Sequence, residues 1–257
     1  MRFKIAFAGL LLLAASPVQA TELTVMTSGA FTQAMKDLTP AYEKETHNHI
    51  TLVFGPSLGT APTAIPMRLA RGEKADLVIV GRAALDTFVT KGIVIPPVTD
   101  IVQSPIAMAV KAGAKLPDIS TVAAFKKTLL AAKSVAYSDS VSGVYIQTQM
   151  YKDLGIEAEM IKKSHMISAT PVGLNVASGE IELGFQQLAE LKPVPGITIV
   201  GVLPDGVQRL TFFSAGVVKA SSNQAAAKTL MAWLTAPKQF ATIRNTGLTP
   251  AAEAKKK

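Results

Sequence analysis

Three short turns in this chain place serine or threonine hydroxyls beside glycine, each near a segment with helical periodicity. They contain Ser28 and Gly29, then Ser57, Gly59 and Thr60, and finally Ser142 and Gly143. The start of a helix favours an anion, because its first backbone N–H groups are unpaired and the helix dipole is positive there. Hydroxyl donors at the same place add to that preference. The pattern therefore indicates a cradle for a small anion.

Each of these hydroxyls could instead be an ordinary helix N-cap, since Ser and Thr favour that position. A single turn would favour the N-cap interpretation. Three turns that follow three strands favour a ligand site if the fold brings them to one crevice, because ligands of open α/β sheets bind at the carboxyl ends of the strands.

The segments around the turns predict an α/β fold in two series. Strands are expected at 23–26, 50–54 and 75–80, with helices at 30–46, 63–71 and 83–91. A second series is expected to have strands at 106–110, 134–137 and 182–186, with helices at 122–130 and 144–154. A late strand at 210–218 and a helix at 224–235 would complete the first series. We therefore expect two lobes joined by two chain passages, with a hinge and an interlobe cleft.

The expected boundaries follow from that division of the strands. Lobe 1 comprises residues 21–103 and 212–257, and lobe 2 comprises 104–211. Residues 1–20 are a signal peptide, with Arg2 and Lys4 before the apolar run 5–15 and a small-residue ending at Ala20. The mature chain is thus expected to begin at Thr21 in the periplasm. Because the chain has no cysteine, a lipoprotein anchor, disulfides and thiol chemistry are excluded.

The composition narrows the classes of function. The formal net charge of +8 suits an anionic ligand, but the basic residues are scattered without interleaved aromatics, which argues against a nucleic-acid groove. Three scattered histidines argue against an imidazole metal site, and no phosphate-binding loop, His-Glu-x-x-His or Gly-x-Ser-x-Gly motif is present. We expect no metal and no cofactor. The sequence shows no heptads and no apolar docking stripe, so we expect a monomer without a membrane anchor.

Five segments in order carry a resemblance to a known family: 23–34, 55–60, 71–77, 142–145 and 244–248. Over nearly all of the mature length the chain resembles the periplasmic molybdate-binding-like solute-binding proteins. The resemblance implies the two-lobed periplasmic-binding-protein type II fold. It is more specific for that fold than for a ligand.

Departures from the molybdate pattern bear on the ligand. Gln186 and Gln187 stand where that family usually has a tyrosine, and Pro56 and Leu58 interrupt its serine-rich loop. Arg68 and Arg82, near the first lobe's loops, offer planar guanidinium groups suited to carboxylates, although either could be a solvated helix residue.

The loop 55–60 and the following segment 65–69 are more similar to an enzymatic offshoot of this fold, the periplasmic aconitate isomerases. That resemblance implies interconversion of cis- and trans-aconitate by an allylic proton shift. The chemistry requires a positioned base and groups that stabilise a delocalised anion. Candidate bases are His165, Glu190, Tyr145 and Asp139, and spacing does not select among them.

Two functions of different classes remain open from the sequence. One is the isomerase. The other is a non-catalytic receptor that delivers molybdate, or another oxyanion or carboxylate, to an ABC permease. Both need the same cradle, for which the expected substrate-binding residues are Ser28, Gly29, Ser57, Gly59, Thr60, Arg68, Arg82, Ser142, Gly143, Tyr145, Gln186 and Gln187.

Overall fold

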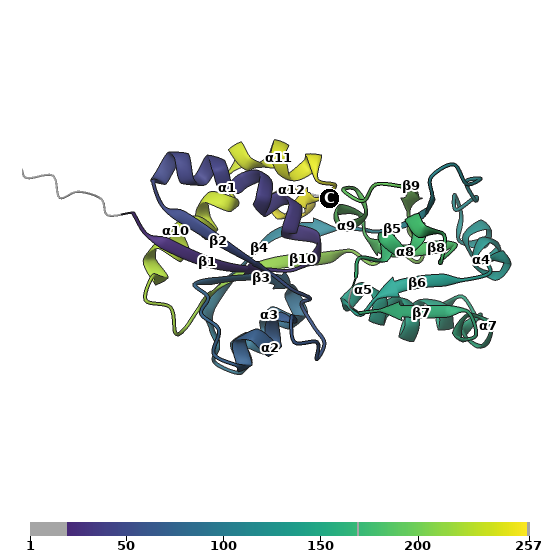
Figure 1. The fold of residues 1–257 in the computed structure, drawn as a ribbon, viewed down its shortest axis with the longest axis horizontal. Coiled ribbons are helices and arrows are strands. Elements are labelled where there is room, and N and C mark those ends of the chain that lie inside the picture. The colour runs from purple at the N-terminus through teal and green to yellow at the C-terminus, as the bar shows by residue number, and fades with distance from the viewer. Residues whose placement is uncertain (1–19, 169, 256–257) are drawn as a thin grey trace, which may run out of the picture.

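The computed structural model describes residues 20–168 and 170–255, so nearly all of the expected signal peptide lies outside the described residues. Two sheets form the centres of two lobes that lie side by side (Figure 1). The strand order is β11-β4-β10-β3-β1-β2 in lobe 1 and β7-β6-β8-β5-β9 in lobe 2. The expected two-lobed α/β fold is confirmed.

Lobe 1 has a mixed sheet. Its strands are β1 (Glu22–Thr27), β2 (His49–Phe54), β3 (Leu77–Gly81), β4 (Val94–Ser104), β10 (Thr211–Val218) and β11 (Thr249–Pro250). β1 pairs in parallel with β2 and β3, whereas β10 runs antiparallel between β3 and β4. Every residue of β3 is buried, as its uninterrupted apolar run requires of a strand covered on both faces.

Helices cover both faces of the lobe 1 sheet. They are η1 (Gly29–Phe31), α1 (Thr32–Thr46), α2 (Ile65–Ala70), α3 (Arg82–Thr90), α10 (Gln224–Leu234), η3 (Pro237–Gln239), α11 (Phe240–Asn245) and α12 (Ala251–Ala254). The α1, α10 and α11 helices pack on one face, and α2 and α3 on the other (Figure 1). The carboxyl ends of β1, β2 and β3 thus belong to a sheet that helices cover on both faces.

Lobe 2 repeats the layered plan with shorter elements. Its strands are β5 (Ile106–Lys111), β6 (Val135–Ser138), β7 (Ser164–Ile167), β8 (Leu183–Gln187) and β9 (Ile197–Val202). Its helices are α4 (Val122–Ala131), α5 (Val141–Tyr145), η2 (Ile146–Met150), α6 (Tyr151–Asp153), α7 (Glu157–Ile161), α8 (Val172–Ser178) and α9 (Leu188–Leu191). β6 lies parallel between β7 and β8, so the three strands end at the same edge.

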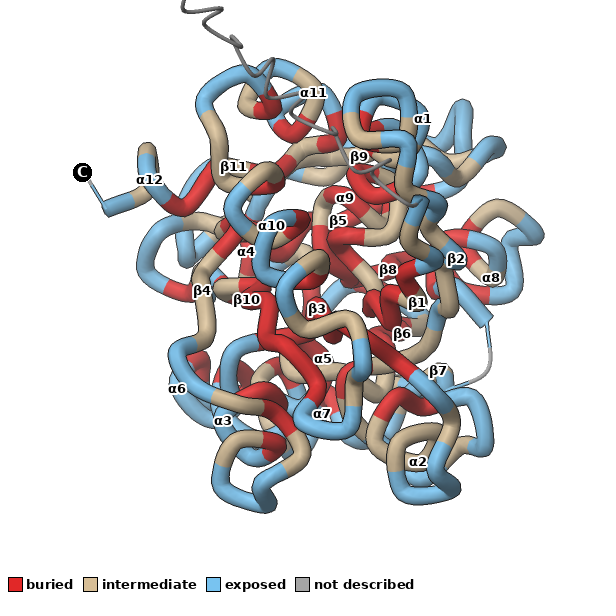
Figure 2. Tube along the Cα trace, turned by 90° about the vertical axis from the view of Figure 1, so that its left-hand side faces the viewer, coloured by how far each residue is buried: buried red, intermediate tan, exposed pale blue. Residues whose placement is uncertain are grey.

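The chain crosses between the lobes twice, once between β4 and β5 and once between β9 and β10. β4 and β10 pair antiparallel in lobe 1, with a register shift between Phe213 and Ser214 beside the crossing. Buried residues concentrate in the strands of both sheets and in the helix faces against them (Figure 2). None of the helices in the described part of the chain is long and apolar enough to cross a membrane.

Several elements lie outside the sequence-based expectation. β4 contains Pro96 and Pro97, which argue against a strand by pattern alone. β7, β9, α8 and α9 were likewise not expected. β7 and α9 have only four residues each, too few to show a period. The helix expected from 144 begins at Val141, and the helix expected from 63 begins at Ile65.

Candidate functional site

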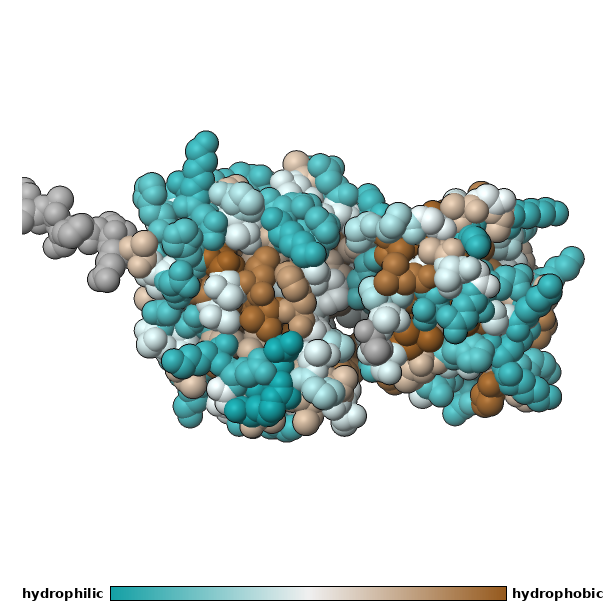
Figure 3. Space-filling view, in the orientation of Figure 1, coloured by the Kyte–Doolittle hydropathy of each residue, from teal (hydrophilic) through white to brown (hydrophobic). Residues whose placement is uncertain are grey.

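A cleft of about 330 Å³ lies at the boundary between the lobes, where Figure 3 shows a hollow between two masses. The segments after β1 and β2 and the last residue of β3, Gly81, line it from lobe 1. The ends of β6, β7 and β8 and the segments that follow them line it from lobe 2. Thr211 and Phe213 of the crossing strand β10 complete the wall. The carboxyl ends of the strands therefore meet at one crevice, as this class of sheet requires.

Lobe 1 presents a buried pair of serine hydroxyls. The Oγ atoms of Ser28 and Ser57 lie 2.5 Å apart, and the backbone N–H of Gly81 donates to Ser57 Oγ at 3.1 Å. Ser28 is held at the end of β1 by its own N–H, which donates to the carbonyl of Ile79 at 3.0 Å. The pair thus joins the ends of three strands, and both serines line the cleft.

Lobe 2 presents a chain of three hydroxyls. Ser138 Oγ lies 2.8 Å from Ser140 Oγ, which lies 3.0 Å from Ser142 Oγ. All three line the cleft at the end of β6 and the beginning of α5. A chain of hydroxyls can turn its protons toward whichever acceptor a ligand offers.

The N-cap interpretation does not fit the two serines that precede helices here. Ser28 and Ser140 stand at the N-cap positions of η1 and α5, yet neither side chain bonds the helix it precedes. Thr121 shows the ordinary case, since its Oγ1 accepts from the backbone N–H of Ala124 at 3.1 Å. The cleft hydroxyls are therefore directed to one another and to the cleft.

Two carboxyl groups also line the cleft, Glu190 from α9 and Asp139 from the loop between β6 and α5. Burial raises the pKa of the Glu190 carboxyl to about 7, against hydrogen bonds from the Gln186 side chain and the Gln187 backbone that lower it. Burial also raises the pKa of Asp139. A carboxyl with a pKa near neutrality can both accept and donate a proton under physiological conditions.

Gly29 makes room for the Glu190 carboxyl. A Cβ atom at position 29 would lie 2.5 Å from Glu190 Oε1 and 3.0 Å from its carboxyl carbon. The φ angle of Gly29 is +36°, which a side-chain-bearing residue adopts at a cost. Glycine is thus required here for a close approach of a lobe 2 carboxyl to the lobe 1 backbone.

The two glutamines occupy the end of β8. Gln186 Oε1 accepts from the backbone N–H of Val172 at 3.2 Å, and Gln187 Nε2 donates to Thr211 Oγ1 at 3.3 Å. Gln187 Oε1 is buried and has no hydrogen-bond partner among the described residues. A buried acceptor left unpaired is costly, so this oxygen is suited to a donor on a ligand.

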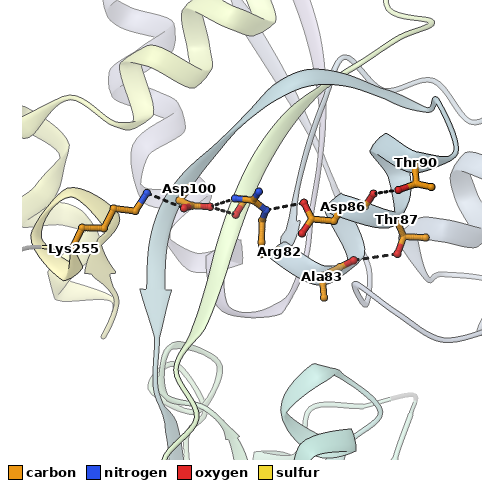
Figure 4. Close-up of polar contacts among 8 residues, drawn as sticks. Arg82, Ala83, Asp86, Thr87, Thr90, Asp100 and Lys255 are labelled. Carbon is orange, nitrogen blue, oxygen red and sulfur yellow. Dashed lines mark hydrogen bonds and ion pairs between the residues drawn. The ribbon is translucent and has the colours of Figure 1, made fainter.

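The two predicted arginines do not line the cleft. Arg68 donates through Nε to the carbonyl of Thr63 at 3.0 Å and through Nη1 to Glu73 at 2.7 Å. Arg82 bonds Asp86 at 2.8 Å and Asp100 at 2.9 Å, and Asp100 also bonds Lys255 (Figure 4). Both guanidinium groups are occupied by carboxylates of lobe 1 itself. Arg68–Glu73 and Arg82–Asp86 are local pairs, whereas Arg82–Asp100 forms only in the folded lobe.

Four other predicted residues also lie outside the lining. The Tyr145 hydroxyl donates to the carbonyl of Val207 at 3.0 Å, away from the cleft. Gly143 lies inside α5, where a Cβ would lie 1.6 Å from the carbonyl oxygen of Ser138, so it serves helix–strand packing. Gly59 and Thr60 are exposed on the loop before α2. Gly59 still approaches the other lobe, because a Cβ there would lie 3.5 Å from Asp139 Oδ2.

The structure therefore brings together six of the predicted residues: Ser28, Gly29, Ser57, Ser142, Gln186 and Gln187. It adds lining residues that were not in that set, among them Thr32, Ser138, Ser140, Ser168, Thr170 and Thr211. Ser168 and Thr170 follow β7, so only recognition of that short strand would have pointed to them. Of the four candidate bases, Glu190 and Asp139 line the cleft, whereas His165 is exposed on β7.

Neutral donors dominate the electrostatics of the cleft. None of the described lining residues is Lys, Arg or His. The described chain also holds no cluster of three or more His, Asp or Glu residues arranged to bind a metal ion. Any anion in this cleft is held by hydroxyls, amides and backbone N–H groups, as at other helix starts and backbone anion sites.

Comparison with known proteins places these features in a family context. A family model for the bacterial extracellular solute-binding proteins matches residues 23–249. An aconitate isomerase from Pseudomonas sp. is 46% identical over 247 residues, which cover 94% of each chain.

Two solved structures resemble the fold at low sequence identity. The periplasmic molybdate-binding protein of Azotobacter vinelandii has a TM-score of 0.73 and 20% identity, covering 88% of this chain and 98% of that one. The sulfate-binding protein SubI of Mycobacterium tuberculosis has a TM-score of 0.71 and 13% identity, covering 91% and 88%. These two likenesses show the fold alone.

Proposed function

The chain belongs to the bacterial extracellular solute-binding protein family, and we propose that it is an aconitate isomerase that interconverts cis- and trans-aconitate. The full-length similarity to an aconitate isomerase supports this function. Within the structure, the observation that carries it is Glu190, a carboxyl with a pKa of about 7 that lines a cleft of neutral donors. A family member that only bound its solute would have no need of a proton-transferring group there.

The reaction moves one proton and one double bond. A carboxylate removes a proton from the methylene carbon of aconitate, and the electron pair spreads over the three allylic carbons and the adjoining carboxylates. A proton then adds to the former vinyl carbon, which becomes the new methylene, so no atom is gained or lost. Glu190 is suited to the transfer because a catalytic carboxyl works best when its pKa lies near the operating pH.

The hydroxyls supply binding and charge stabilisation. Ser28 and Ser57 from lobe 1, with Ser140 and Ser142 from lobe 2, are placed to donate to the carboxylates of the substrate. Preorganised donors in a partly desolvated site stabilise the charge that develops in the transition state. Arg68 and Arg82, which the sequence suggested as carboxylate clamps, have no part in this proposal because lobe 1 carboxylates occupy them.

The expected signal peptide indicates the cellular compartment in which the reaction takes place. We place the mature protein, from Thr21 onward, in the periplasm as a monomer after removal of residues 1–20. The ligand would be a tricarboxylate, and the chemistry uses only side chains and backbone groups of the protein.

A direct assay tests the proposal. The purified protein is incubated with trans-aconitate, and cis-aconitate is followed by proton NMR, with calorimetry on trans-aconitate, citrate, sulfate and molybdate. Conversion in both directions, with weak molybdate binding, is the expected result. Tight binding of molybdate or trans-aconitate without conversion would contradict the isomerase and favour a receptor that serves an ABC permease.

A further inference from the structure

Two carboxyl groups that line the cleft, Asp139 and Glu190, have no ion-pair partner among the described residues that would give them a structural role. Elsewhere in the described chain, Asp100 is paired with Arg82 and Lys255, and Glu73 with Arg68 and Arg71. Asp76 is buried without an ion pair to a described residue, but its carboxylate accepts hydrogen bonds from the Thr24 N–H and the Ser221 hydroxyl. Neither Asp139 nor Glu190 forms an ion pair with a described residue. Buried charge without a partner is costly to a fold, which makes such groups candidates for function.

The two groups come from neighbouring strand ends and face different parts of lobe 1. Asp139 follows β6 and Glu190 follows β8, and these strands pair directly in the lobe 2 sheet. Glu190 lies against Gly29, and Asp139 faces Gly59. The arrangement of the two lobes therefore places two separate carboxyls along one cleft.

The Glu190 position is fixed by packing on both sides. Its helix α9 inserts Ala189 into the core of lobe 1, while Leu191 packs in lobe 2 against Ala107 and Ala109. Asp139 lies instead on the loop between β6 and α5, where its N–H donates to the carbonyl of Ile167 at 3.1 Å. The backbone that carries Glu190 is thus held by packing in both lobes, whereas Asp139 is carried by a loop of lobe 2 alone.

The charge of the ligand adds a second constraint. Two ionised carboxylates in a cleft without a described cationic lining residue would repel a tricarboxylate. At least one of them must therefore carry a proton when the substrate binds. A protonated carboxyl beside an ionised one is an acid and base pair ready for use.

We propose that the isomerisation uses both carboxyls, one as the base at one allylic carbon and the other as the acid at the other carbon. This inference rests on the proposed function. The ionised member removes the proton from the methylene carbon, the double bond shifts, and the protonated member gives its proton to the former vinyl carbon. The pair ends with its single proton on the other carboxyl and is reset by exchange with water. Reversal of the reaction exchanges the two roles.

Deuterium exchange separates the two roles. Asp139→Asn and Glu190→Gln are each incubated in D₂O with cis-aconitate and, separately, with trans-aconitate, and NMR follows both isomerisation and deuterium in the recovered substrate. Each variant should isomerise about 10²-fold or more slower than the native protein. Each should still exchange the methylene protons of one isomer, and the two variants should act on opposite isomers. Asp139→Glu, which keeps the carboxyl, should retain exchange with both.

The outcomes distinguish this inference from the proposed function. If the native protein neither exchanges nor isomerises either substrate, the isomerase itself is wrong. If the native protein isomerises but Asp139→Asn does so equally fast, Asp139 has no catalytic role. Loss of exchange with both isomers in Asp139→Asn would likewise overturn the shared mechanism. Asp205→Asn, at an exposed position outside the cleft, is the control and should match the native protein in every measurement.

Discussion

The two walls of the cleft differ in kind. Lobe 1 contributes hydroxyls, backbone groups and apolar side chains, with no ionisable group among its described lining residues. Lobe 2 contributes a similar set of hydroxyls and, in addition, both carboxyls, Asp139 and Glu190. Both lobes thus supply hydrogen-bond donors for an anion, whereas, among the described lining residues, only those of lobe 2 include carboxyl groups that can transfer a proton.

Local structure explains why the carboxyls belong to lobe 2. In lobe 1 the ends of β1 and β3 continue into η1 and α3, and the acidic residues Asp86 and Asp100 bond Arg82 away from the cleft. In lobe 2 the end of β8 continues into α9, which wedges between the lobes and turns Glu190 toward Gly29. The wedge places a carboxyl in a desolvated position without burying it in a core.

The largest effect is expected from Gly29→Ala, a change on the lobe 1 wall that displaces the Glu190 carboxyl of lobe 2. The added Cβ would lie 2.5 Å from Glu190 Oε1, so the carboxyl must leave its position. We expect turnover to fall by about 10²- to 10⁴-fold, the usual contribution of general acid–base catalysis. Gly113→Ala is the matched control, because Gly113 also has a positive φ but open space around it. Equal kinetics for the two variants would mean that the Glu190 position is unimportant.

A second prediction concerns stability as a function of pH. Because the folded-state pKa of Glu190 is raised to about 7 from 4.5, the folded protein binds more protons than the unfolded chain between these values. The contribution of this group is fully present below about pH 4.5, and is lost as pH rises through about 7. Glu190→Gln should therefore be more stable than the native protein above pH 7, by up to about 3 kcal/mol.

Urea denaturation of both proteins at pH 5 and pH 8 checks this prediction. The difference in unfolding free energy between Glu190→Gln and the native protein should grow in favour of the variant as pH rises. A difference that stays constant would mean that the carboxyl is not desolvated in the folded protein.

A smaller effect is expected on the lobe 1 wall. Ser57→Ala removes the acceptor of the Gly81 N–H and one hydroxyl of the Ser28 pair. We expect affinity for trans-aconitate to weaken by about 1–3 kcal/mol, with turnover at saturation much less affected. Thr121→Ala removes an N-cap remote from the cleft and should cost about 1 kcal/mol of stability without changing affinity. Identical affinity losses in both variants would count against a binding role for Ser57.

The smallest effect is expected at Arg68. Its guanidinium is engaged with Glu73 and the carbonyl of Thr63, so Arg68→Lys should change stability by less than about 1 kcal/mol and leave turnover nearly intact. Arg71→Lys, which alters the other arginine on Glu73, is the control. A loss of turnover confined to Arg68→Lys would restore the carboxylate clamp that the sequence suggested.

The position of the serine–glycine turns could be predicted from the sequence because strand ends and helix starts leave local signals. Ser28, Ser57 and Ser142 were predicted in this way, and all three line the cleft. Arg82 was expected at the cleft, but its guanidinium bonds Asp86, four residues along the same helix, and Asp100, which is distant in sequence and meets it only in the folded lobe.

Glu190, in contrast, could not be singled out from the sequence. It was one of four candidate bases, and no local pattern marked it, since its burial depends on packing of α9 against lobe 1. A four-residue helix has too few positions to show a period. Long-range packing, rather than residue type, decides which carboxyl is desolvated.

The most direct test of the account is a comparison of binding and turnover in Glu190→Gln. The variant keeps the shape of the side chain and removes its ability to exchange a proton near neutral pH. Calorimetry with trans-aconitate should give a Kd within a few-fold of the native value, while NMR shows turnover reduced by about 10²-fold or more. Native turnover in this variant, or a loss of affinity as large as the loss of turnover, would contradict the assignment of chemistry to lobe 2.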